Sequence, residues 1–372
     1  GQRRLKKRHI TPSRKDMDNM EENKKLRIGI IGMGRISWAH TGGLSVCPDA
    51  VITAVCDINP DALNSAGDRL NIPAERRFTD YHDLIACPEV DAVEICTPNY
   101  LHVPMATDVI RAGKPVNIEK PLGATYEGIP ELLEAYRENP QPNMMCFSYR
   151  FMPAVRYAKK LLDEKKLGKI VSVDVEYLQS GAFIEGRRLE WRFDKKKAGT
   201  GAIGDLGVHL IDMTRYLLGD ITAVCACKKT VVKERKLLDS EEYGVVKTDD
   251  FCTFIADLEC GAAASFTVTR CARGHSNTIK YDIYGTDGVI SFNLNNPKGI
   301  YLCIGDEVKT VGLHKVDVPP EYAASQEGSF VDIALGRFRE KPADIFEGAK
   351  CQKVVDAIDL SGDRREWVTI EY

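Results

Sequence analysis

The chain has 372 residues, of which 44% are hydrophobic and 28% are charged, and this composition excludes a disordered or fibrous chain. Its length exceeds what one hydrophobic core usually organises, so we expect two domains. The net charge of −3 gives no general attraction to nucleic acid, and no apolar run approaches the roughly 20 residues that cross a bilayer. We therefore expect a cytoplasmic protein with no nucleic-acid or membrane partner.

The N-terminal segment GQRRLKKRHITPSRK is strongly basic and lacks the apolar core of a signal peptide. We expect residues 1–25 to be a disordered leader or an artificial tail. Met17 and Met20 lie just before the first strand-like run, so our hypothesis is that residues 1–16 are either an artificial addition or a leader.

The first predicted strand lies in LRIGIIGMGRISWAH, which turns through glycines into a helix. Gly32 and Gly34 supply the first two glycines of the dinucleotide fingerprint G-x-G-x-x-G, and Ser37 stands at the third. The start of a helix after such a turn can hold a pyrophosphate through its backbone N–H groups. Gly32, Gly34, Arg35 and Ile36 are therefore candidate cofactor contacts.

A second predicted strand, AVITAVCD, ends in Asp57, 23 residues after Gly34. An acidic residue near this spacing binds the hydroxyls of the adenosine ribose. Its carboxylate would repel the 2′-phosphate of NADP, and Ile58 and Asn59 supply no arginine to reverse that preference. The sequence therefore predicts NAD as the cofactor.

Strands and helices continue to alternate up to about residue 150. Predicted strands lie in VDAVEICTPNYLH, KPVNIEKPL and NMMCFSYRF, with helices over about 103–112 and 126–138 between them. This alternation predicts a doubly wound parallel sheet, the Rossmann fold, over residues 26–150. Ligands bind at the carboxyl ends of parallel strands. The candidate cofactor residues at those ends are Thr97, Pro98, Asn99, His102, Glu119 and Lys120.

After about residue 150 the strict alternation stops. A helix-like segment, AVRYAKKLLDEKK, is followed by strand-like runs such as KIVSVDVEYL, DFCTFIADLE, AAASFTVTR and TIKYDIYG. Consecutive strands with few helices between them predict a largely antiparallel sheet, so we expect an α+β domain over residues 151–372. A late helix over about 348–360 is expected to pack back toward the first domain.

The stretch GAIGDLGVHLID places Asp205, His209 and Asp212 four and then three residues apart, which puts them on one face of a helix. Two interpretations fit Asp205 and His209: a structural ion pair, or a histidine oriented for proton transfer by its carboxylate partner. Asp212 either packs in the core or binds substrate weakly. No metal site is predicted, because no further His or Cys cluster completes a ligand shell.

With EKPL and GTGAIGDLGVHLID, and with CTPNYLH, YRFMPAVR and YGTDGVI in this order, the chain resembles the glucose–fructose oxidoreductase and inositol dehydrogenase family (Gfo/Idh/MocA) from about residue 26 to the C-terminus. The departures are small: Ser37 replaces the third glycine, and Thr200 interrupts a usual glycine triplet. The resemblance implies an NAD(P)-dependent oxidoreductase with an open-faced second sheet, often used to form homo-oligomers. It also implies the residues that meet at the nicotinamide, namely Lys120, Asp205 and His209.

Oxidation of a secondary alcohol needs a base for the hydroxyl proton and a donor that stabilises the developing alkoxide. We assign His209 as the general base, Asp205 as its partner, and Lys120 as the group that binds and polarises the hydroxyl oxygen. Lys120 as the base is a second assignment, because a buried lysine beside a cation can have a lowered pKa.

Other polar residues are candidates for the substrate side. Trp191 and Arg192 would suit a sugar ring, or else belong to a surface loop with a packing tryptophan. Tyr149 and Arg150 close the last predicted strand of the first half and are placed to reach nicotinamide or substrate. His40 on the first helix is interpreted as structural. The predicted substrate-binding set is Lys120, Tyr149, Arg150, Trp191, Arg192, Asp205 and His209.

The resemblance and these residues predict an NAD-dependent enzyme that oxidises a secondary ring hydroxyl of a sugar or glycoside. Three alternatives stay open. They are an inositol dehydrogenase, an oxidoreductase that keeps NAD bound and recycles it with a second sugar, and a non-enzymatic NAD-binding regulator that responds to sugars. A regulator is expected to lose the catalytic set, which this chain retains.

None of the twelve cysteines forms a C-x-x-C pair, and several lie inside apolar strand-like runs. In such runs cysteine behaves as a small hydrophobic residue. Without a secretion signal we expect free, reduced thiols, as in the cytoplasm.

Overall fold

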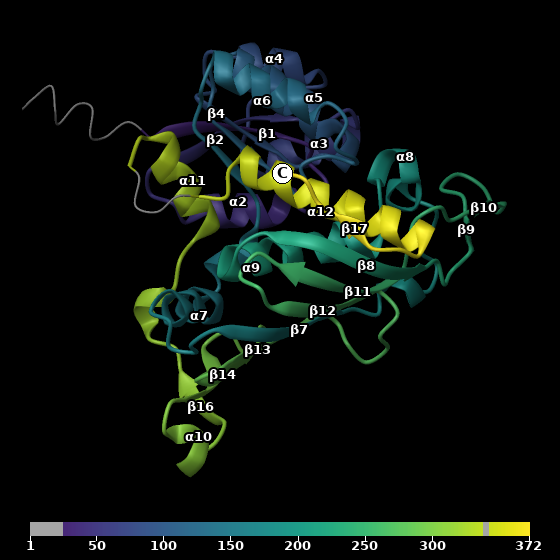
Figure 1. Cartoon of the computed structure of the whole chain (residues 1–372). Helices are drawn as coiled ribbons and strands as arrows, with labels where there is room; N and C mark the ends of the chain where they lie inside the picture. Colours follow the sequence, from purple (N-terminus) through teal and green to yellow (C-terminus); the bar gives the residue numbers. More distant parts are fainter. Residues whose placement is uncertain (1–24, 338–341) are drawn as a thin grey trace, which may run out of the picture.

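The computed structural model describes residues 25–337 and 342–372. Two β-sheets lie one above the other in Figure 1, and helix α12 (Ile345–Arg364) runs between them. No helix within the described ranges is long and apolar enough to cross a bilayer. The predicted leader lies, except for Lys25, outside the described residues.

The first sheet has six parallel strands in the order β3-β2-β1-β4-β5-β6, as the Rossmann prediction requires. Its central strands are short apolar runs, and helices on both faces bury them. Because all six strands are parallel, their carboxyl ends share one edge. The strands are β1 (Leu26–Ile31), β2 (Ala50–Cys56), β3 (Arg77–Phe78), β4 (Ala92–Ile95), β5 (Val116–Ile118) and β6 (Asn143–Met145).

Helices of the first half lie on both faces of this sheet. Figure 1 shows α4, α5 and α6 on the outer face and α2 on the face toward the second sheet. The bounds are α2 (Ser37–Ser45), α3 (Pro60–Arg69), α4 (Tyr81–Ala86), α5 (His102–Arg111) and α6 (Ile129–Glu138).

Two predicted boundaries differ in this half. Helix α6 begins at Ile129 and not near 126, because Gly128 has a φ of 76°, a left-handed conformation outside the helix. Strand β6 ends at Met145, and Tyr149 and Arg150 lie in a 3₁₀ turn beyond it. The sequence pattern also does not predict β3, which has two residues.

The second sheet has nine strands in the order β16-β15-β14-β13-β7-β12-β11-β8-β17. All neighbours are antiparallel except β7 and β12, so the largely antiparallel prediction is confirmed. The strands are β7 (Ile170–Leu178), β8 (Ile221–Lys229), β11 (Phe251–Leu258), β12 (Ala263–Thr269), β13 (Thr278–Gly285), β14 (Gly288–Asn293), β15 (Gly299–Ile304), β16 (His314–Asp317) and β17 (Val368–Thr369), with a separate pair β9 (Glu234–Lys236) and β10 (Tyr243–Val245).

Helix α12 has 20 residues and is longer than the predicted 348–360. It begins earlier because the Asp344 carboxylate accepts the N–H groups of Phe346 and Glu347 and caps the first turn. Along its length, Asp356 accepts the N–H of Tyr126 at 2.9 Å, so α12 contacts the first half of the chain as well as β8. The other helices of the second half are α7 (Pro153–Asp163), α8 (Lys195–Ala198), α9 (Val208–Leu218), α10 (Glu307–Thr310) and α11 (Gln326–Ala334).

Helix α11 completes the core of the first half. Phe330, Val331 and Ile333 are buried in one hydrophobic cluster with residues of β1 and β2, and α11 packs on α2. Residues from the C-terminal part of the chain therefore belong to the packing of the first sheet.

All twelve cysteines are free in the structure. We expect thiol titration of the denatured, unreduced protein to find about twelve reactive groups per chain. A result of ten or fewer from freshly purified protein would contradict the free-thiol arrangement.

Candidate active site

The glycine turn after β1 has the features that a dinucleotide needs. Gly32 has a φ of 91°, and a Cβ there would lie 2.8 Å from the carbonyl oxygen of Cys96, so glycine is required. A Cβ on Gly34 would meet nothing within 4 Å, so protein packing does not explain this second glycine. Open space over the backbone suits a ligand that approaches closely. Ser37 is buried and closes the turn by donating to the Gly34 carbonyl at 2.6 Å.

Asp57 lies beside this turn at the end of β2. Its carboxylate accepts the N–H of Met33 at 2.7 Å and that of Asn59 at 2.8 Å, which holds the negative charge against the glycine turn. Arg35 and Ile36 are exposed at the start of the following helix. The open backbone and the adjacent carboxylate fit the pyrophosphate and ribose of NAD.

The residues after β4 also make contacts within the protein. The buried Asn99 donates its Nδ2 to the carbonyl of Ala198 at 3.0 Å, which joins the two halves of the chain. The His102 ring lies between the carbonyl oxygens of Pro121 at 2.7 Å and Thr97 at 2.8 Å, and burial lowers its pKa. Direct cofactor contacts stay a prediction for this group, which is Thr97, Pro98, Asn99 and His102.

Lys120 follows β5 and reaches the second half of the chain. Its Nζ donates to the carbonyl oxygen of Asp205 at 2.9 Å and to the carboxylate oxygen Oδ1 at 3.0 Å. Arg270, which follows β12, donates Nη2 to the other carboxylate oxygen at 2.8 Å. Asp205 therefore lies between two cations, one from each half of the chain.

The predicted hydrogen bond between Asp205 and His209 is not made. Residues 203–207 form a π turn, in which hydrogen bonds run from i to i+5. A full turn of such a helix takes more than four residues, so Asp205 and His209 do not lie directly above one another. The two carboxylate oxygens are bound by Lys120 and Arg270 instead. The buried Nδ1 of His209 has no hydrogen-bond partner among the residues that the structure describes. The correction is that Asp205 is the partner of Lys120.

The charges of the site shift the pKa values of Asp205 and His209 and so fix the protonation state of each at neutral pH. Burial alone would raise the pKa of Asp205, but Lys120, Arg270 and Arg192 outweigh burial and hold that pKa well below its usual value. Burial and the charge of Lys120 lower the pKa of His209 from 6.5 to about 3. At neutral pH, therefore, Asp205 is an anion, and His209 is a neutral imidazole that can accept a proton.

An aromatic and polar wall lies beside His209. The Tyr149 ring meets the imidazole edge-on, with centroids 4.7 Å apart. The Tyr149 and Tyr177 hydroxyls are 2.9 Å apart, and Tyr177 donates to Asn277 at 2.8 Å, as Gln179 does at 2.7 Å. The sequence analysis identified only Tyr149 in this wall, because the other three residues stand on strands or loops without a motif.

Arg150 is committed to an ion pair. Its Nε and Nη2 both donate to the carboxylate of Asp212, at 2.8 Å and 2.5 Å, and its guanidinium lies over the Tyr216 ring. The Asp212 side chain is 1% exposed, and burial raises its pKa although Arg150 opposes the shift. The structure favours the packing interpretation of Asp212, and Arg150 is its partner.

Trp191 and Arg192 begin a 3₁₀ turn that ends at Phe193. The Arg192 guanidinium lies 4.4 Å from the centroid of the Trp191 ring, and its positive charge helps to lower the pKa of Asp205. Both residues are half-buried, and their contact with substrate stays a prediction.

Two further residues of the site carry no sequence signal. One is Arg270, which lies 65 residues from Asp205 along the chain. The other is Asp249, whose carboxylate accepts the N–H groups of Gly201 at 2.5 Å and Ile203 at 3.0 Å. A Cβ on Gly201 would lie 1.8 Å from the Asp249 carbonyl oxygen, so this glycine permits the close approach that fixes the start of the site helix.

Two family models match the chain. The one described as an oxidoreductase family with an NAD-binding Rossmann fold matches residues 26–147, and the GFO/IDH/MocA C-terminal domain matches residues 155–291. The chain belongs to the Gfo/Idh/MocA family. The predicted family, its fold and NAD as cofactor are confirmed, and the protein is an NAD-dependent dehydrogenase.

Levoglucosan dehydrogenase of Pseudarthrobacter phenanthrenivorans is 34% identical over 334 residues, which cover 84% of this chain and 85% of the relative. Inositol 2-dehydrogenase of Rhizobium meliloti is 26% identical over 78% of this chain and 82% of its own length. Among solved structures, levoglucosan dehydrogenase in complex with NADH matches with a TM-score of 0.86 and 30% identity, covering 94% of this chain and 100% of that one.

Replacing Asp57 by serine should weaken NAD binding and shift the preference toward NADP, because the charge that repels the 2′-phosphate is removed. The measurement is the ratio of the two dissociation constants, from quenching of protein fluorescence by NADH and NADPH. An unchanged ratio would show that Asp57 does not face the ribose.

The lowered pKa of His209 predicts a pH-dependent stability. Between the usual value of 6.5 and about 3, the unfolded state binds the proton that the folded state excludes, so stability is lost as pH falls through this window. The loss is at most about 1.4 kcal/mol per pH unit. Denaturant unfolding at pH 7 and pH 5 should show a smaller loss in His209→Asn than in the wild type, and an equal loss would contradict the neutral, buried imidazole.

Proposed function

We propose that the protein oxidises a secondary ring hydroxyl of a sugar, anhydro-sugar or glycoside. The observation that carries this proposal is that the Lys120 ammonium acts on the neutral imidazole of His209, whose Nδ1 has no hydrogen-bond partner in the described part of the chain, beside a wall of hydroxyl and amide groups. Polyhydroxylated rings match such a wall because each ring hydroxyl both donates and accepts hydrogen bonds. The sugar-directed names of the relatives support the same class, levoglucosan dehydrogenase foremost.

NAD, when bound at the glycine turn, supplies the hydride acceptor. Lys120 has three N–H donors and gives two of them to Asp205, which leaves one for a substrate oxygen. Its charge would stabilise the alkoxide that develops on that oxygen. His209 is the base of this proposal, since its imidazole is neutral and its Nδ1 makes no hydrogen bond to the residues that the structure describes, whereas the ammonium of Lys120 is held by a carboxylate.

Asp205 acts through Lys120 in this proposal. Its carboxylate, itself fixed by Arg270, holds the ammonium at one position at the edge of the first sheet. The pair also joins the half that binds the cofactor to the half that carries His209. A substrate bound to Lys120 would therefore be oriented relative to both halves at once.

We also propose four features of the whole protein. The division into domains near residue 150 follows the change from the parallel to the largely antiparallel sheet. A homo-oligomer would form through the outer face of the nine-stranded sheet, where Ile255, Tyr284 and Tyr301 are exposed. Free cysteines support a reducing, cytoplasmic location, and the substrate is a small molecule.

The test is NADH absorbance with a panel of levoglucosan, glucose, xylose, a methyl glucoside, glucose 6-phosphate and myo-inositol. At least one neutral pyranose or anhydro-sugar should be oxidised, with inositol oxidation as the outcome that shifts the substrate class to cyclitols. Tight NAD binding without turnover of any compound, alone or together with a keto sugar as hydride acceptor, would contradict the proposal and favour the regulator.

With the best substrate, Lys120→Ala and His209→Asn should each lower kcat by about a hundredfold or more, the usual scale for losing a proton-transfer or alkoxide-stabilising group. The double variant should be little worse than either single one, because the groups act as one unit. Asp205→Asn should have a smaller effect, since the amide oxygen can still accept from Lys120. Near-normal activity in both single variants, with NADH binding retained, would place the chemistry elsewhere.

A further inference from the structure

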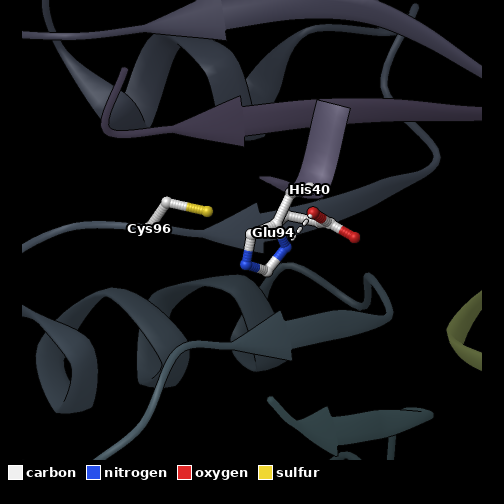
Figure 2. Close-up of side chains that lie close together, drawn as sticks. All are labelled: His40, Glu94 and Cys96. Atoms are coloured by element: carbon white, nitrogen blue, oxygen red, sulfur yellow. Dashed lines mark hydrogen bonds and ion pairs between the residues drawn. The ribbon is translucent and has the colours of Figure 1, made fainter. Parts of the chain in front are cut away.

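A buried cluster of polar side chains lies between helix α2 and the first sheet, and one of its members, Glu119, is next to Lys120 in the sequence. His40 on α2 sits between Glu94 on β4 and Glu119 just after β5, and Figure 2 shows His40, Glu94 and Cys96 of this group. His40 Nδ1 lies 2.8 Å from Glu94 Oε2, and Nε2 lies 2.9 Å from Glu119 Oε1. His40, Glu94 and Glu119 are 2%, 0% and 7% exposed, so the cluster is closed to water.

The second oxygen of each carboxylate is also bound. Glu94 Oε1 accepts from the Asn117 side chain at 3.2 Å, and Glu119 Oε2 accepts the backbone N–H of Lys120 at 3.0 Å. The chain of contacts continues from Lys120 Nζ to Asp205. Two hydrogen bonds therefore link the imidazole of His40 to the backbone of Lys120, and the Lys120 side chain continues from there to the site.

Both ring nitrogens of His40 face a carboxylate oxygen, and a neutral imidazole has one N–H to donate. With both carboxylates ionised, the imidazolium satisfies the arrangement because it donates on both sides. Burial alone would lower the pKa of His40, but the acidic groups that face the ring, Glu94 among them, raise that pKa well above its usual value. Burial raises the pKa values of Cys96 and Cys146, so these thiols are neutral and the carboxylates supply the charge. The other ionisable groups that interact with the ring are Glu119 and Glu327.

The same side chains could be taken for a metal site. His40, Glu94 and Cys96 form one group of three possible ligands, and His40, Glu119 and Cys146 form another. However, the four carboxylate oxygens already accept hydrogen bonds, and none of the buried atoms left without a partner in the described residues belongs to these side chains. The observations therefore favour a hydrogen-bonded cluster complete without an ion.

We propose that His40 is a positioning residue for Lys120: it holds the Glu119 carboxylate, which in turn holds the peptide N–H from which the Lys120 side chain departs. The proposal deepens the proposed function and rests on Lys120 binding the substrate oxygen. Glu119 is the element that transmits the constraint, since one of its oxygens faces His40 and the other faces the Lys120 N–H.

The constraint matters because Lys120 must reach across to the other half of the chain. Its Nζ meets a carboxylate 85 residues away, and a small rotation at the end of β5 would displace the ammonium. Errors of about 1 Å in such positions cost about a hundredfold in rate. A charged imidazole that is hydrogen-bonded through both ring nitrogens resists that rotation more than a neutral partner would.

Two substitutions of His40 separate positioning from general stability. The amide nitrogen of glutamine takes the place of Nε2, so His40→Gln keeps a donor to Glu119. The amide nitrogen of asparagine takes the place of Nδ1, so His40→Asn keeps a donor to Glu94 and loses the branch to Lys120. Both variants remove the same charge from the same buried site, and each is the control for the other.

The first readout is hydrogen–deuterium exchange of the Lys120 amide, resolved to single residues. Exchange should be at least about tenfold faster in His40→Asn than in His40→Gln, the scale of one hydrogen bond to a charged group. The second readout is kinetic: kcat should fall about tenfold more in His40→Asn, while the dissociation constant for NADH stays the same in both.

Equal exchange and equal kcat in the two variants would overturn the proposal and leave His40 a structural residue. Stoichiometric metal in the wild-type protein that both variants lose would also overturn it and assign the cluster as a metal site. If the wild type oxidises no compound of the panel, the proposed function fails, while the exchange experiment still decides whether His40 holds the Lys120 peptide.

Discussion

The ion pair between Lys120 and Asp205 is the interaction on which the rest of the site depends. Lys120 stands where β5 of the parallel sheet ends, and Asp205 stands in the helical segment that precedes α9 in the other half of the chain. At 3.0 Å the pair brings the two halves together at one point. Together with Arg270, which binds the other carboxylate oxygen of Asp205, the pair fixes the Lys120 ammonium at the edge of the sheet where the glycine turn lies.

The π turn over residues 203–207 makes this pairing possible. In a regular α-helix Asp205 and His209 would lie one above the other, and the carboxylate would be available to the imidazole. The wider turn changes that relation, and the carboxylate lies between Lys120 and Arg270 instead. Single π turns occur often at functional sites, and here the turn leaves the buried Nδ1 of His209 without a partner in the described part of the chain.

Burial has opposite consequences for the two ionisable residues of this helical segment. Asp205 is buried with cations, so it remains charged and serves to hold Lys120. His209 is buried next to Lys120 and beside Tyr149, so the proton is excluded and the ring stays neutral. Groups whose surroundings push their pKa values apart in this way take different roles in proton transfer. The same principle, with the charges reversed, keeps His40 protonated between two carboxylates.

The sequence by itself determined the features that are local. The alternation of strands and helices, the glycine turn with Gly32 and Gly34, the acid Asp57 at a strand end and the residues Lys120, Asp205 and His209 can all be identified from short motifs and their spacing. They can be identified because each depends on a few consecutive residues. The family resemblance further implied that Lys120, Asp205 and His209 meet at one site, which spacing alone does not show.

Only the tertiary structure decided which of these groups are partners. Arg270 reaches Asp205 from 65 residues away, His40 reaches Glu94 and Glu119 from 54 and 79 residues away, and Arg150 is bound by Asp212 across 62 residues. The spacing of four residues favoured a pair of Asp205 and His209, but the π turn places the Asp205 carboxylate between Lys120 and Arg270 instead. The physical reason is that a buried charge takes the nearest opposite charge in space, and that distance is set by how the two sheets pack and not by separation along the chain.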